Sequence, residues 1–471
     1  MALTKIQGVT FYKINRRTII CCALCNNKFQ YSRTLKNHIM IKQIVFIAIS
    51  ALSFGILAYS FFRIYSFMKL TKTHKTGNFG KRIIKTLNVA VFQTKILRKP
   101  VIGILHALVF WGFCVILFGF LEIIVDGISG LEKSLSSLGI LYRIFMALGD
   151  VFAFIIFFAI IIFLVRRIFF NIKRFNGIEM KHKSHVDANI ALTLILLLMI
   201  TLIGMNTFYI TSTSPENGKL YPLSNFLAFW IGQGEEDPFL YEVCWWTHIS
   251  LIYIFMNILP YSKHFHVFMS VPNVFLSRLE PLGKLPNMYN ITKEIKMMMD
   301  PNLASAASAE PVAEIARFGV KDAEDVTWKN YLDSLSCTEC GRCTASCPAN
   351  ITGKKLSPRK IMIDLRSRMK EKAPHIIKEG ISFTDNKSLL HDYISAEEIW
   401  ACTTCNACAQ ECPVNINHPE MIIFMRRYLV MEESAAPSML NVMFTNIENN
   451  GAPWQFSPDD RLLWAKDLTT N

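Results

Sequence analysis

The sequence predicts an all-α membrane protein: a five-helix transmembrane bundle followed by a cytoplasmic α-helical domain. Three observations predict this fold class. The 471 residues are 52% hydrophobic and only 18% charged, whereas average soluble proteins carry about 25% charged residues. Five long apolar stretches follow one another, and two four-cysteine motifs come after them. The composition excludes disordered, collagen-like and coiled-coil proteins.

The apolar stretches are the expected membrane spans. Each has about the 20 residues that a helix needs to cross a hydrocarbon core of about 30 Å. We place the spans near residues 41–62, 101–125, 142–165, 188–210 and 243–262. Buried helices of a soluble protein are the weaker interpretation, because one soluble shell would hardly cover five such runs.

Charge in the connecting loops predicts the orientation. Loop 63–99 has ten Lys/Arg and no acid, and loop 166–187 has six Lys/Arg, whereas loops 126–141 and 211–242 have one each. Cytoplasmic loops carry the excess of positive charge. We therefore expect a bacterial inner-membrane protein with a periplasmic N-terminus and everything after residue 262 in the cytoplasm. Residues 263–471 have 23 basic and 25 acidic residues, which argues against nucleic-acid binding.

Residues 1–39 form a basic leader with seven Lys/Arg and no acid. The predicted topology would require these charges to be translocated, so we expect that translation starts at Met40 or that the leader is disordered. Cys22, Cys25 and His38 have the spacing of a zinc finger, but structural zinc sites have four ligands and the fourth is missing. We interpret this spacing as coincidence, and a membrane-tethered zinc regulator as a weak hypothesis.

Two copies of Cys-x2-Cys-x2-Cys-x3-Cys-Pro form the strongest signal. Bacterial ferredoxins bind [4Fe–4S] clusters with this run, and in two-cluster ferredoxins the fourth cysteine ligates the other cluster. We assign to cluster 1 Cys337, Cys340, Cys343 and Cys412, and to cluster 2 Cys402, Cys405, Cys408 and Cys347. Zinc sites and disulfides are the weaker alternatives, because zinc sites use cysteine pairs and disulfides do not fit a cytoplasmic domain.

The two motifs stand far apart, with 54 residues between Cys347 and Cys402. Helical apolar spacing at 356–373, 394–401 and 418–434 predicts an α-helical ferredoxin module. The expected regions are a leader at 1–39, a membrane domain at 40–270, a linker with peripheral helices at 271–325, a two-cluster domain at 326–435 and an extension at 436–471.

Histidines near the spans are candidate ligands of b-type haem, because polar residues inside a membrane are costly and usually functional. His106 lies near the start of the second span, and His264 and His266 follow the fifth. His106 and His266 share the cytoplasmic depth and form the expected haem pair. Contact with lipid headgroups is the alternative role. No Cys-x-x-Cys-His occurs, so c-type haem is not expected.

His248 is the candidate for a second role within the membrane. It precedes His266 by 18 residues, or five helical turns, so a continuous helix would place both on one face about 27 Å apart. On that helix His264 would point away from His266. His248 could ligate a second haem, with Met205 as a possible partner, or bind a quinone oxygen.

Residues 40–280 resemble the gamma subunit of respiratory nitrate reductase. The resemblance rests on the five-span layout and on two segments, His106 with Phe110-Trp111-Gly112-Phe113, and Pro260-Tyr261-Ser262-Lys263-His264-Phe265-His266. In that family two histidines of span 2 and two of span 5 hold two haems. Three of these are matched, by His106, His248 and His266. Ile116 stands at the fourth position, which leaves the second haem in doubt.

Residues 325–435 resemble the ferredoxin subunit of heterodisulfide reductases, through both cysteine motifs. Asn450-Gly451-Ala452-Pro453-Trp454, with Arg461 and Trp464, is similar to the linker that leads into cysteine-rich CCG domains in fused members. No CCG repeat occurs in this sequence. The resemblance therefore implies a cytoplasmic partner, a CCG-domain iron–sulfur subunit or a flavoprotein or both, that carries the catalytic site.

Together these observations favour an electron-transfer subunit of a membrane oxidoreductase. It would link the quinone pool, through b-type haem and two [4Fe–4S] clusters, to a cytoplasmic redox partner, with quinone and membrane lipid as its other ligands. The alternative is a membrane anchor and assembly platform without quinone chemistry. The direction of electron flow stays open. No glycine-rich dinucleotide fingerprint occurs, so direct NAD(P) or FAD binding is not expected.

Overall fold

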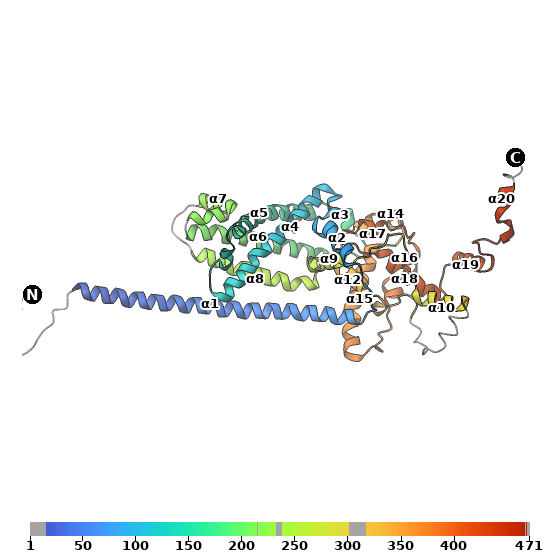
Figure 1. Cartoon of the computed structure of the whole chain (residues 1–471), viewed down its shortest axis with the longest axis horizontal. Coiled ribbons are helices and arrows are strands. Elements are labelled where there is room, and N and C mark those ends of the chain that lie inside the picture. Colours follow the sequence, from blue (N-terminus) through green and yellow to red (C-terminus); the bar gives the residue numbers. More distant parts are fainter. Residues whose placement is uncertain (1–15, 214, 232–237, 301–316, 467, 469–471) are drawn as a thin grey trace, which may run out of the picture. The chain divides into compact units, whose positions relative to one another are not determined.

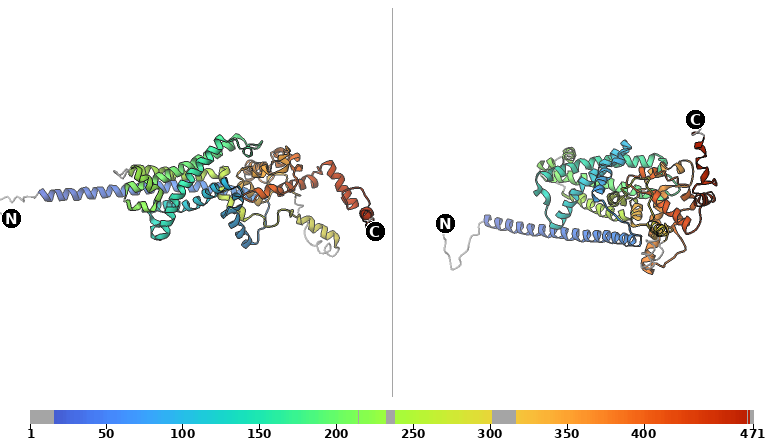
Figure 2. Two further views of the ribbon diagram at one scale, coloured as in Figure 1. Left: turned by 90° about the horizontal axis from the view of Figure 1, so that it is seen from above. Right: turned by 45° about the vertical axis from the view of Figure 1, so that its right-hand side comes forward.

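The computed structural model describes residues 16–213, 215–231, 238–300, 317–466 and 468, without the side chains of 16–39, 215–217 and 290. Across these residues the secondary structure is helical, with two isolated β-bridges and no strand (Figure 1). The two further views show coiled ribbons and connecting segments alone (Figure 2). The all-α prediction is confirmed.

Five of the described helices are long and apolar enough to cross a membrane. They are Met40–Lys69 within α1 (Arg16–Lys69), α4 (Pro100–Ser129), α5 (Ile140–Phe169), α6 (His182–Ser212), and Pro238–Tyr261, which contains α8 (Pro238–Ile258). Each overlaps one expected span, so the five-span prediction is confirmed by length and composition. Which side each loop occupies stays a prediction.

Helix α1 begins at Arg16, whereas the expected span began at residue 41. Helical backbone therefore includes residues 16–39. That the leader is untranslated or disordered stays a prediction, and residues 1–15 lie outside the described residues. Cys22, Cys25 and His38 lie where no side chains are described, so the zinc-finger spacing is not tested. The translation start at Met40 also stays a prediction.

Helix α8 ends at Ile258 because the chain changes direction around Pro260, which has no N–H to continue the helical hydrogen bonds. Two 3-10 turns follow, Leu259–Tyr261 and Lys263–Phe265, and then α9 (His266–Phe275) begins. The helix does not continue from His248 to His266, so the condition under which the two histidines would share one helix face is not met.

The chain forms two compact units. Unit 1 consists of Met1–Tyr59, Leu105–Leu164 and Leu192–Ile258, and unit 2 of Ser60–Ile104, Val165–Ala191 and Leu259–Asn471. Unit 1 therefore holds most of the apolar spans and the short helix α7 (Pro222–Ile231). Unit 2 holds both cysteine motifs together with the basic loops 63–99 and 166–187.

The helices of unit 1 pack through small and aromatic residues. Ala153 and Ile156 of α5 pack against Leu198 of α6. A Cβ on Gly127 of α4 would lie 2.3 Å from the ring of Phe46, so the close approach of α1 and α4 requires glycine there. Apolar contact of this kind is the main source of helix association in lipid.

The helices of unit 2 are mostly short. They are α2 (Phe79–Thr86), α3 (Thr94–Leu97), α9, α10 (Tyr289–Met299), α12 (Trp328–Ser336), α13 (Arg342–Ala345), α14 (Pro348–Ile351), α15 (Pro358–Glu379), α16 (Ala396–Trp400), α17 (Ala407–Glu411), α18 (His418–Met431), α19 (Ser438–Asn450) and α20 (Leu463–Lys466). The expected helices at 356–373, 394–401 and 418–434 correspond to α15, α16 and α18.

The core of unit 2 is assembled from distant parts of the chain. Met362 and Leu365 of α15 pack with Met421 of α18, and Phe67 from the end of α1 and Phe265 belong to the same buried cluster. A bridge between Lys72 and Thr327 pairs the segment after α1 with the start of α12. The cysteine motifs therefore share their core with the ends of membrane helices.

Candidate functional site

The first cysteine motif forms a loop between α12 and α14. Cys337 is the C-terminal cap of α12, and Cys347 precedes Pro348 at the start of α14. Thr327 and Asn330 form a capping box at the start of α12, which satisfies N–H groups that a helix leaves without partners. The sequence thus fixes the helix that leads into the motif.

Gly341 determines the path of this loop. Its φ is 72°, a left-handed conformation that glycine adopts at little cost. A Cβ here would lie 2.3 Å from the carbonyl oxygen of Arg174 and 2.8 Å from Nη1 of Arg359. Both the conformation and the close approach of the neighbouring chain therefore require glycine.

The second cysteine motif repeats this backbone path. Helix α16 ends two residues before Cys402, and α17 follows the turn. Thr404 and Asn406 have φ values of 54° and 61°, at the positions that Glu339 (56°) and Gly341 occupy in the first motif. Asparagine tolerates this conformation, whereas it is uncommon for β-branched threonine. The two motifs are therefore structural repeats with different side chains.

Cysteines of both motifs meet at one cavity. One cavity in unit 2 is lined by cysteines of both motifs, Cys337, Cys340, Cys343 and Cys412. These are the four residues that the sequence assigned to cluster 1. The structure therefore has the grouping that an exchanged ligand set requires, while ligation itself stays a prediction.

The other four cysteines form a second group. Burial raises the pKa of the Cys408 thiol, and Cys402, Cys347 and Cys405 beside it raise that pKa further. Cys347 comes from the first motif, yet it is an electrostatic neighbour of cysteines of the second motif. This is the set that was assigned to cluster 2.

The arrangement of thiols fits clusters better than single ions. Among the described residues, no three His, Cys, Asp or Glu side chains converge as ligands of one metal ion. A structural zinc ion needs four such ligands around one point, whereas a [4Fe–4S] cluster spreads four thiolates over four iron atoms. Two groups of four thiols can therefore hold two clusters, each of which supplies one-electron transfer.

Burial shapes the electrostatics of both groups. It raises the pKa of Cys337 to about 11 and that of Cys412 to about 12, so these thiolates need bound metal to stay ionised. Backbone N–H groups also reach sulfur: Ile416 N lies 3.4 Å from Cys412 Sγ, and Thr404 N lies 3.3 Å from Cys402 Sγ. Such hydrogen bonds help to set cluster potentials.

Three cationic side chains bind the carbonyl oxygens of cysteines in these motifs. The pairs are Lys95 with Cys412 (3.2 Å), Arg366 with Cys337 (3.2 Å), and Arg426 with Cys402. Positive charge beside a cluster favours its reduced, more negative state, because net charge is one determinant of its potential. Lys95 belongs to loop 63–99, far from both motifs in the sequence.

His418, which the sequence analysis did not identify, also lines the cavity of the cluster 1 cysteines. Its side chain is 1% exposed, and its Nδ1 atom has no hydrogen-bond partner among the described residues. Burial lowers its pKa to about 3, so the ring is neutral at pH 7. The only signal in the sequence is its place six residues after Cys412, where the first motif has Gly353 after Cys347.

The loop between the third and fourth spans packs on the first motif. Glu179 Oε1 accepts hydrogen bonds of 2.7 Å from Arg359 Nε and from Ser357 Oγ, and the Glu179–Arg359 ion pair is almost fully buried. Lys263 Nζ lies 3.8 Å from a carboxylate oxygen of Glu339, inside the motif. Loops 63–99 and 166–187 therefore both contact the region of the cysteine motifs.

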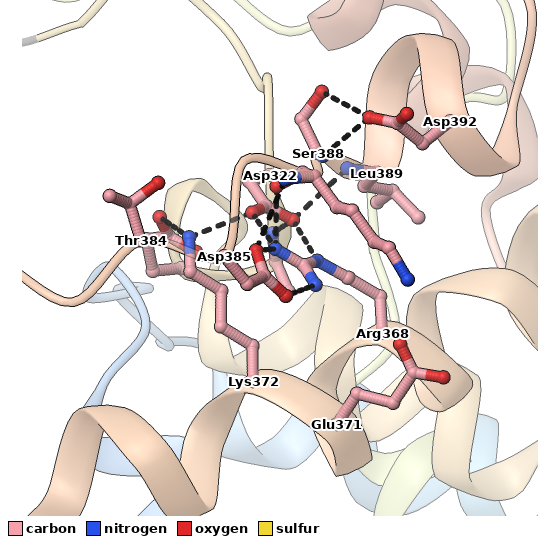
Figure 3. Close-up of polar contacts among 12 residues, drawn as sticks. Asp322, Arg368, Glu371, Lys372, Thr384, Asp385, Ser388, Leu389 and Asp392 are labelled. Atoms are coloured by element: carbon pink, nitrogen blue, oxygen red, sulfur yellow. Dashed lines mark hydrogen bonds and ion pairs between the residues drawn. The ribbon is translucent and has the colours of Figure 1, made fainter.

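A buried ion cluster fixes the segments that surround the motifs. The Arg368 guanidinium lies between the carboxylates of Asp322 and Asp385 and donates to both (Figure 3). Lys372 Nζ donates to Asp322 at 2.7 Å. Although burial raises the pKa of Asp322, hydrogen bonds from Arg368 and Lys372 hold it below its ordinary value. All of these groups are paired, so we interpret the cluster as structural.

Comparison with known families identifies this region. Residues 336–416 match the 4Fe-4S dicluster domain. The match spans both cysteine motifs and therefore supports iron–sulfur clusters as the cofactors of this region. The dicluster domain accounts for all eight cysteines of the two motifs.

Curated relatives extend the comparison into the membrane part. The chain is 30% identical over 453 residues to the "probable iron-sulfur-binding oxidoreductase FadF" of Bacillus subtilis, covering 86% of this chain and 59% of that protein. It is 28% identical to the EtfAB:quinone oxidoreductase of Syntrophomonas wolfei, over 84% and 55% of the two chains. A ferredoxin/F(420)H(2)-dependent CoB-CoM heterodisulfide reductase polypeptide of Methanosarcina acetivorans is 36% identical over 107 residues, 22% of this chain and 52% of that one.

The homologues are thus iron–sulfur oxidoreductases with a dicluster domain, which confirms that part of the predicted resemblance. The chain spans a little more than half the length of the first two relatives. No solved structure matches it. The resemblance of the membrane part to a nitrate reductase gamma subunit stays a prediction.

The structure brings together two of the candidate haem ligands. The rings of His264 and His266 have centroids 5.9 Å apart, and Nδ1 of His266 lies 3.3 Å from the carbonyl oxygen of Lys263. Burial lowers the pKa of both histidines, to about 3 for His264. His106 belongs to unit 1 and His266 to unit 2, so their pairing around one haem stays a prediction.

His248 lines a cavity of about 310 Å³ in unit 1. Its Nδ1 lies 2.9 Å from the hydroxyl oxygen of Thr201, which itself donates to the carbonyl oxygen of Leu197. If Nδ1–H donates to this hydroxyl, Nε2 keeps a lone pair. Met205 and Ile116, the two positions considered for a partner of His248, line the same cavity.

Five carboxylates and two lysines that the sequence analysis did not identify also line the cavity, among them Glu122 and Lys133. Glu122 accepts a hydrogen bond of 3.3 Å from Tyr142, but its Oε1 atom is buried with no partner among the described residues. Lys133 Nζ is likewise buried without a hydrogen bond and lies 3.9 Å from the ring centroid of Tyr209. An apolar cavity with a few convergent polar groups is typical of a small-molecule site.

Proposed function

We propose that this chain is a membrane electron-transfer subunit that links a quinone in the bilayer to a redox partner, using two [4Fe–4S] clusters and b-type haem. One observation carries the proposal: five apolar spans and two groups of four cysteines occur on one chain, and loops between the spans contact the cysteine motifs. The membrane part and the electron carrier therefore belong to one subunit.

The relatives support a direction for the electrons. The name of the Syntrophomonas relative pairs EtfAB with quinone, and we propose the same partners here, with an EtfAB-type flavoprotein as donor and quinone as acceptor. The donor side lies in the cytoplasm, because loops 63–99 and 166–187 carry the excess of positive charge and share their side with the clusters.

We place the quinone in the cavity of unit 1. Lys133 would donate a hydrogen bond to one quinone oxygen, and Glu122 would pass a proton to a quinone oxygen. Quinone would take up two electrons from the clusters, one at a time, and a second proton from solvent to become quinol. The lone pair on Nε2 of His248 accepts a hydrogen bond from the quinol hydroxyl. The aromatic wall, including Phe120 and Trp245, packs against the ring.

The histidines that remain are the proposed haem ligands. His106 and His266 would hold a b-type haem, with His264 as the alternative to His266. The haem would supply one-electron transfer between the clusters and the membrane site. We assign His248 to quinone rather than to a second haem, because its cavity holds no second histidine and does hold Glu122 and Lys133.

Optical spectroscopy and quinone reduction test this proposal. Purified protein should show the Soret and α bands of b-type haem, and these should disappear in His106→Ala while the cluster signals persist. Reduction of a soluble quinone analogue by dithionite-reduced protein should oxidise both clusters. Clusters without haem bands or quinone reduction would instead support a membrane anchor and assembly platform.

The pH profile tests the quinone site itself. Burial lowers the pKa of Lys133 to about 8, so its ammonium donor is present below pH 8 and lost as the pH rises through about 8. Quinone reduction should fall over this range in the wild type. The Lys133→Gln protein should reduce quinone more slowly at pH 7, and its rate should not fall further near pH 8. Lys219 is exposed, so Lys219→Gln should have the rate and pH profile of the wild type. A Lys133→Gln protein with the wild-type profile would rule out this site.

A further inference from the structure

Helix α7 carries an apolar face with no protein partner among the described residues. The exposed side chains are Leu223 (38%), Phe226 (61%), Phe229 (72%), Trp230 (72%) and Ile231 (60%). The helix has no charged residue over its ten positions. Exposed apolar patches of this kind mark surfaces that bind protein or membrane.

The opposite face of α7 fits closely onto the ends of the spans. Ser224 and Ala228 are fully buried, and they lie one helical turn apart. Ala228 packs in a cluster with Ile210 of α6, and Met146 of α5 lies against the same cluster. Because both residues are small, the helix backbone can lie directly on the membrane helices.

A buried carboxylate holds the start of α7. Asp150, in the third span, is 1% exposed and accepts hydrogen bonds from the backbone N–H groups of Leu223 (2.8 Å) and Ser224 (3.0 Å) and from the Ser224 hydroxyl. Asn206 donates to the same carboxylate at 3.1 Å. A negative charge at a helix N-terminus is favourable, because N–H groups and helix dipole both point toward it. Asp150 thus fixes where α7 begins and how it is rotated.

The connections of α7 restrict what can cover its apolar face. Nine residues join it to the fourth span, which ends at Ser212, and six join it to the fifth, which begins at Pro238. Ten helical residues extend only about 15 Å, which is too short to cross a bilayer. The helix therefore lies at one surface of the membrane, beside α5, whose first turns expose Leu141 and Ile144.

We infer that α7 is an interfacial helix whose Phe226, Phe229 and Trp230 insert into the boundary between lipid headgroups and acyl chains, with Asp150 as its positioning residue. The apolar face continues the exposed apolar surface of α5 into the interface. Aromatic residues, tryptophan above all, are enriched at this depth, and helices that lie in the interface have one strongly apolar face. This inference does not depend on the proposed function.

Photo-crosslinking in membranes tests the inference on the full chain. The photoreactive residue p-benzoylphenylalanine replaces Phe229 in one variant and Ile381 in a control, since Ile381 is also a large apolar residue and is 82% exposed in unit 2. After illumination of native membranes, mass spectrometry should find a phospholipid adduct at 229 and none above background at 381. A crosslink at 229 to a second copy or to another protein, or no adduct, would overturn the inference.

The role of Asp150 needs a second pair of variants. Asp150→Asn, combined with the probe at 229, should lower the yield of the phospholipid adduct while both cluster signals are retained. Ser224→Ala removes one donor to the same carboxylate and should cause a smaller loss in the same direction, which keeps the test open if Asp150→Asn does not fold. Unchanged yields in both variants would refute the positioning role.

Discussion

The two cysteine motifs follow the same backbone path but stand in different surroundings. In the first motif Cys337 and Cys343 are buried, and Glu339 is paired with cations from elsewhere in unit 2. In the second motif Cys405 is exposed, and so is Thr403 beside it. The comparison suggests different tasks: cluster 1 is built into the contacts with the membrane loops, and cluster 2 is the one that a soluble partner can approach.

The exchange of fourth cysteines can be broken directly. Cys412→Ser should remove cluster 1, although Cys412 belongs to the second motif, because Cys412 lines the cavity of Cys337, Cys340 and Cys343. Half of the bound iron should be lost. The electron paramagnetic resonance signal that survives should equal that of Cys337→Ser and differ from that of Cys402→Ser. If Cys412→Ser instead removed the signal of the cluster that Cys402 ligates, the exchange would be contradicted.

The buried contact of the first motif should contribute more to stability than exposed pairs. Glu179→Ala leaves the Arg359 charge buried and unpaired, which typically costs about 3–5 kcal/mol. Lys355→Ala breaks an exposed pair with Glu397 and should cost about 1 kcal/mol or less. Chemical unfolding followed by the loss of cluster absorbance measures both. Equal destabilisation by the two substitutions would show that the loop contact is not a structural support of cluster 1.

The two equivalent turn positions should respond differently to alanine. Gly341→Ala places a Cβ against the Arg174 carbonyl in a left-handed turn, and strain of this kind costs roughly 1–3 kcal/mol. Asn406→Ala keeps a Cβ that the turn already accommodates, so only the modest preference for Asn in this conformation is lost. The same unfolding measurement compares them. A greater loss of stability from Asn406→Ala than from Gly341→Ala would contradict this prediction.

The smallest expected effect concerns His418, which has no counterpart in the other motif. The ring of His418 is a polar group in the cavity of the cluster 1 cysteines. Polar surroundings favour the more negative, reduced state of a cluster, so His418→Leu should lower the reduction potential of cluster 1 and leave that of cluster 2 unchanged. A potentiometric titration that resolves the two signals measures this shift. A common shift of both clusters, or none, would speak against a selective role for His418.

The sequence predicts the parts of this molecule that depend on local pattern. Runs of about 20 apolar residues marked the spans, and the spacing of cysteines marked both motifs and suggested their exchange. The 18-residue interval between His248 and His266 equals five turns only in a continuous helix, and Pro260 interrupts the helix between them. The start of α1 at Arg16 cannot be read from the sequence, because the leader has no apolar pattern.

The residues that support the site could not be predicted in the same way. Tertiary packing makes Glu179, Arg359 and His418 neighbours of the cysteines. No pattern of hydrophobicity or charge along the sequence reveals such contacts. One weak signal was present: Glu179 and Asp187 are the only acids among six bases in loop 166–187. An isolated acid in a basic loop is a reasonable place to look for a buried ion pair.

The hydrogen bond from Lys95 to the carbonyl oxygen of Cys412 has a consequence for biogenesis. Loop 63–99 leaves the ribosome long before either cysteine motif, and Phe67 at its beginning is part of the core on which the motifs fold. We therefore expect the motifs to complete their folding against segments that are synthesised earlier. Clusters should then form only after the first two helices have entered the bilayer, and a chain that fails to insert should bind no iron.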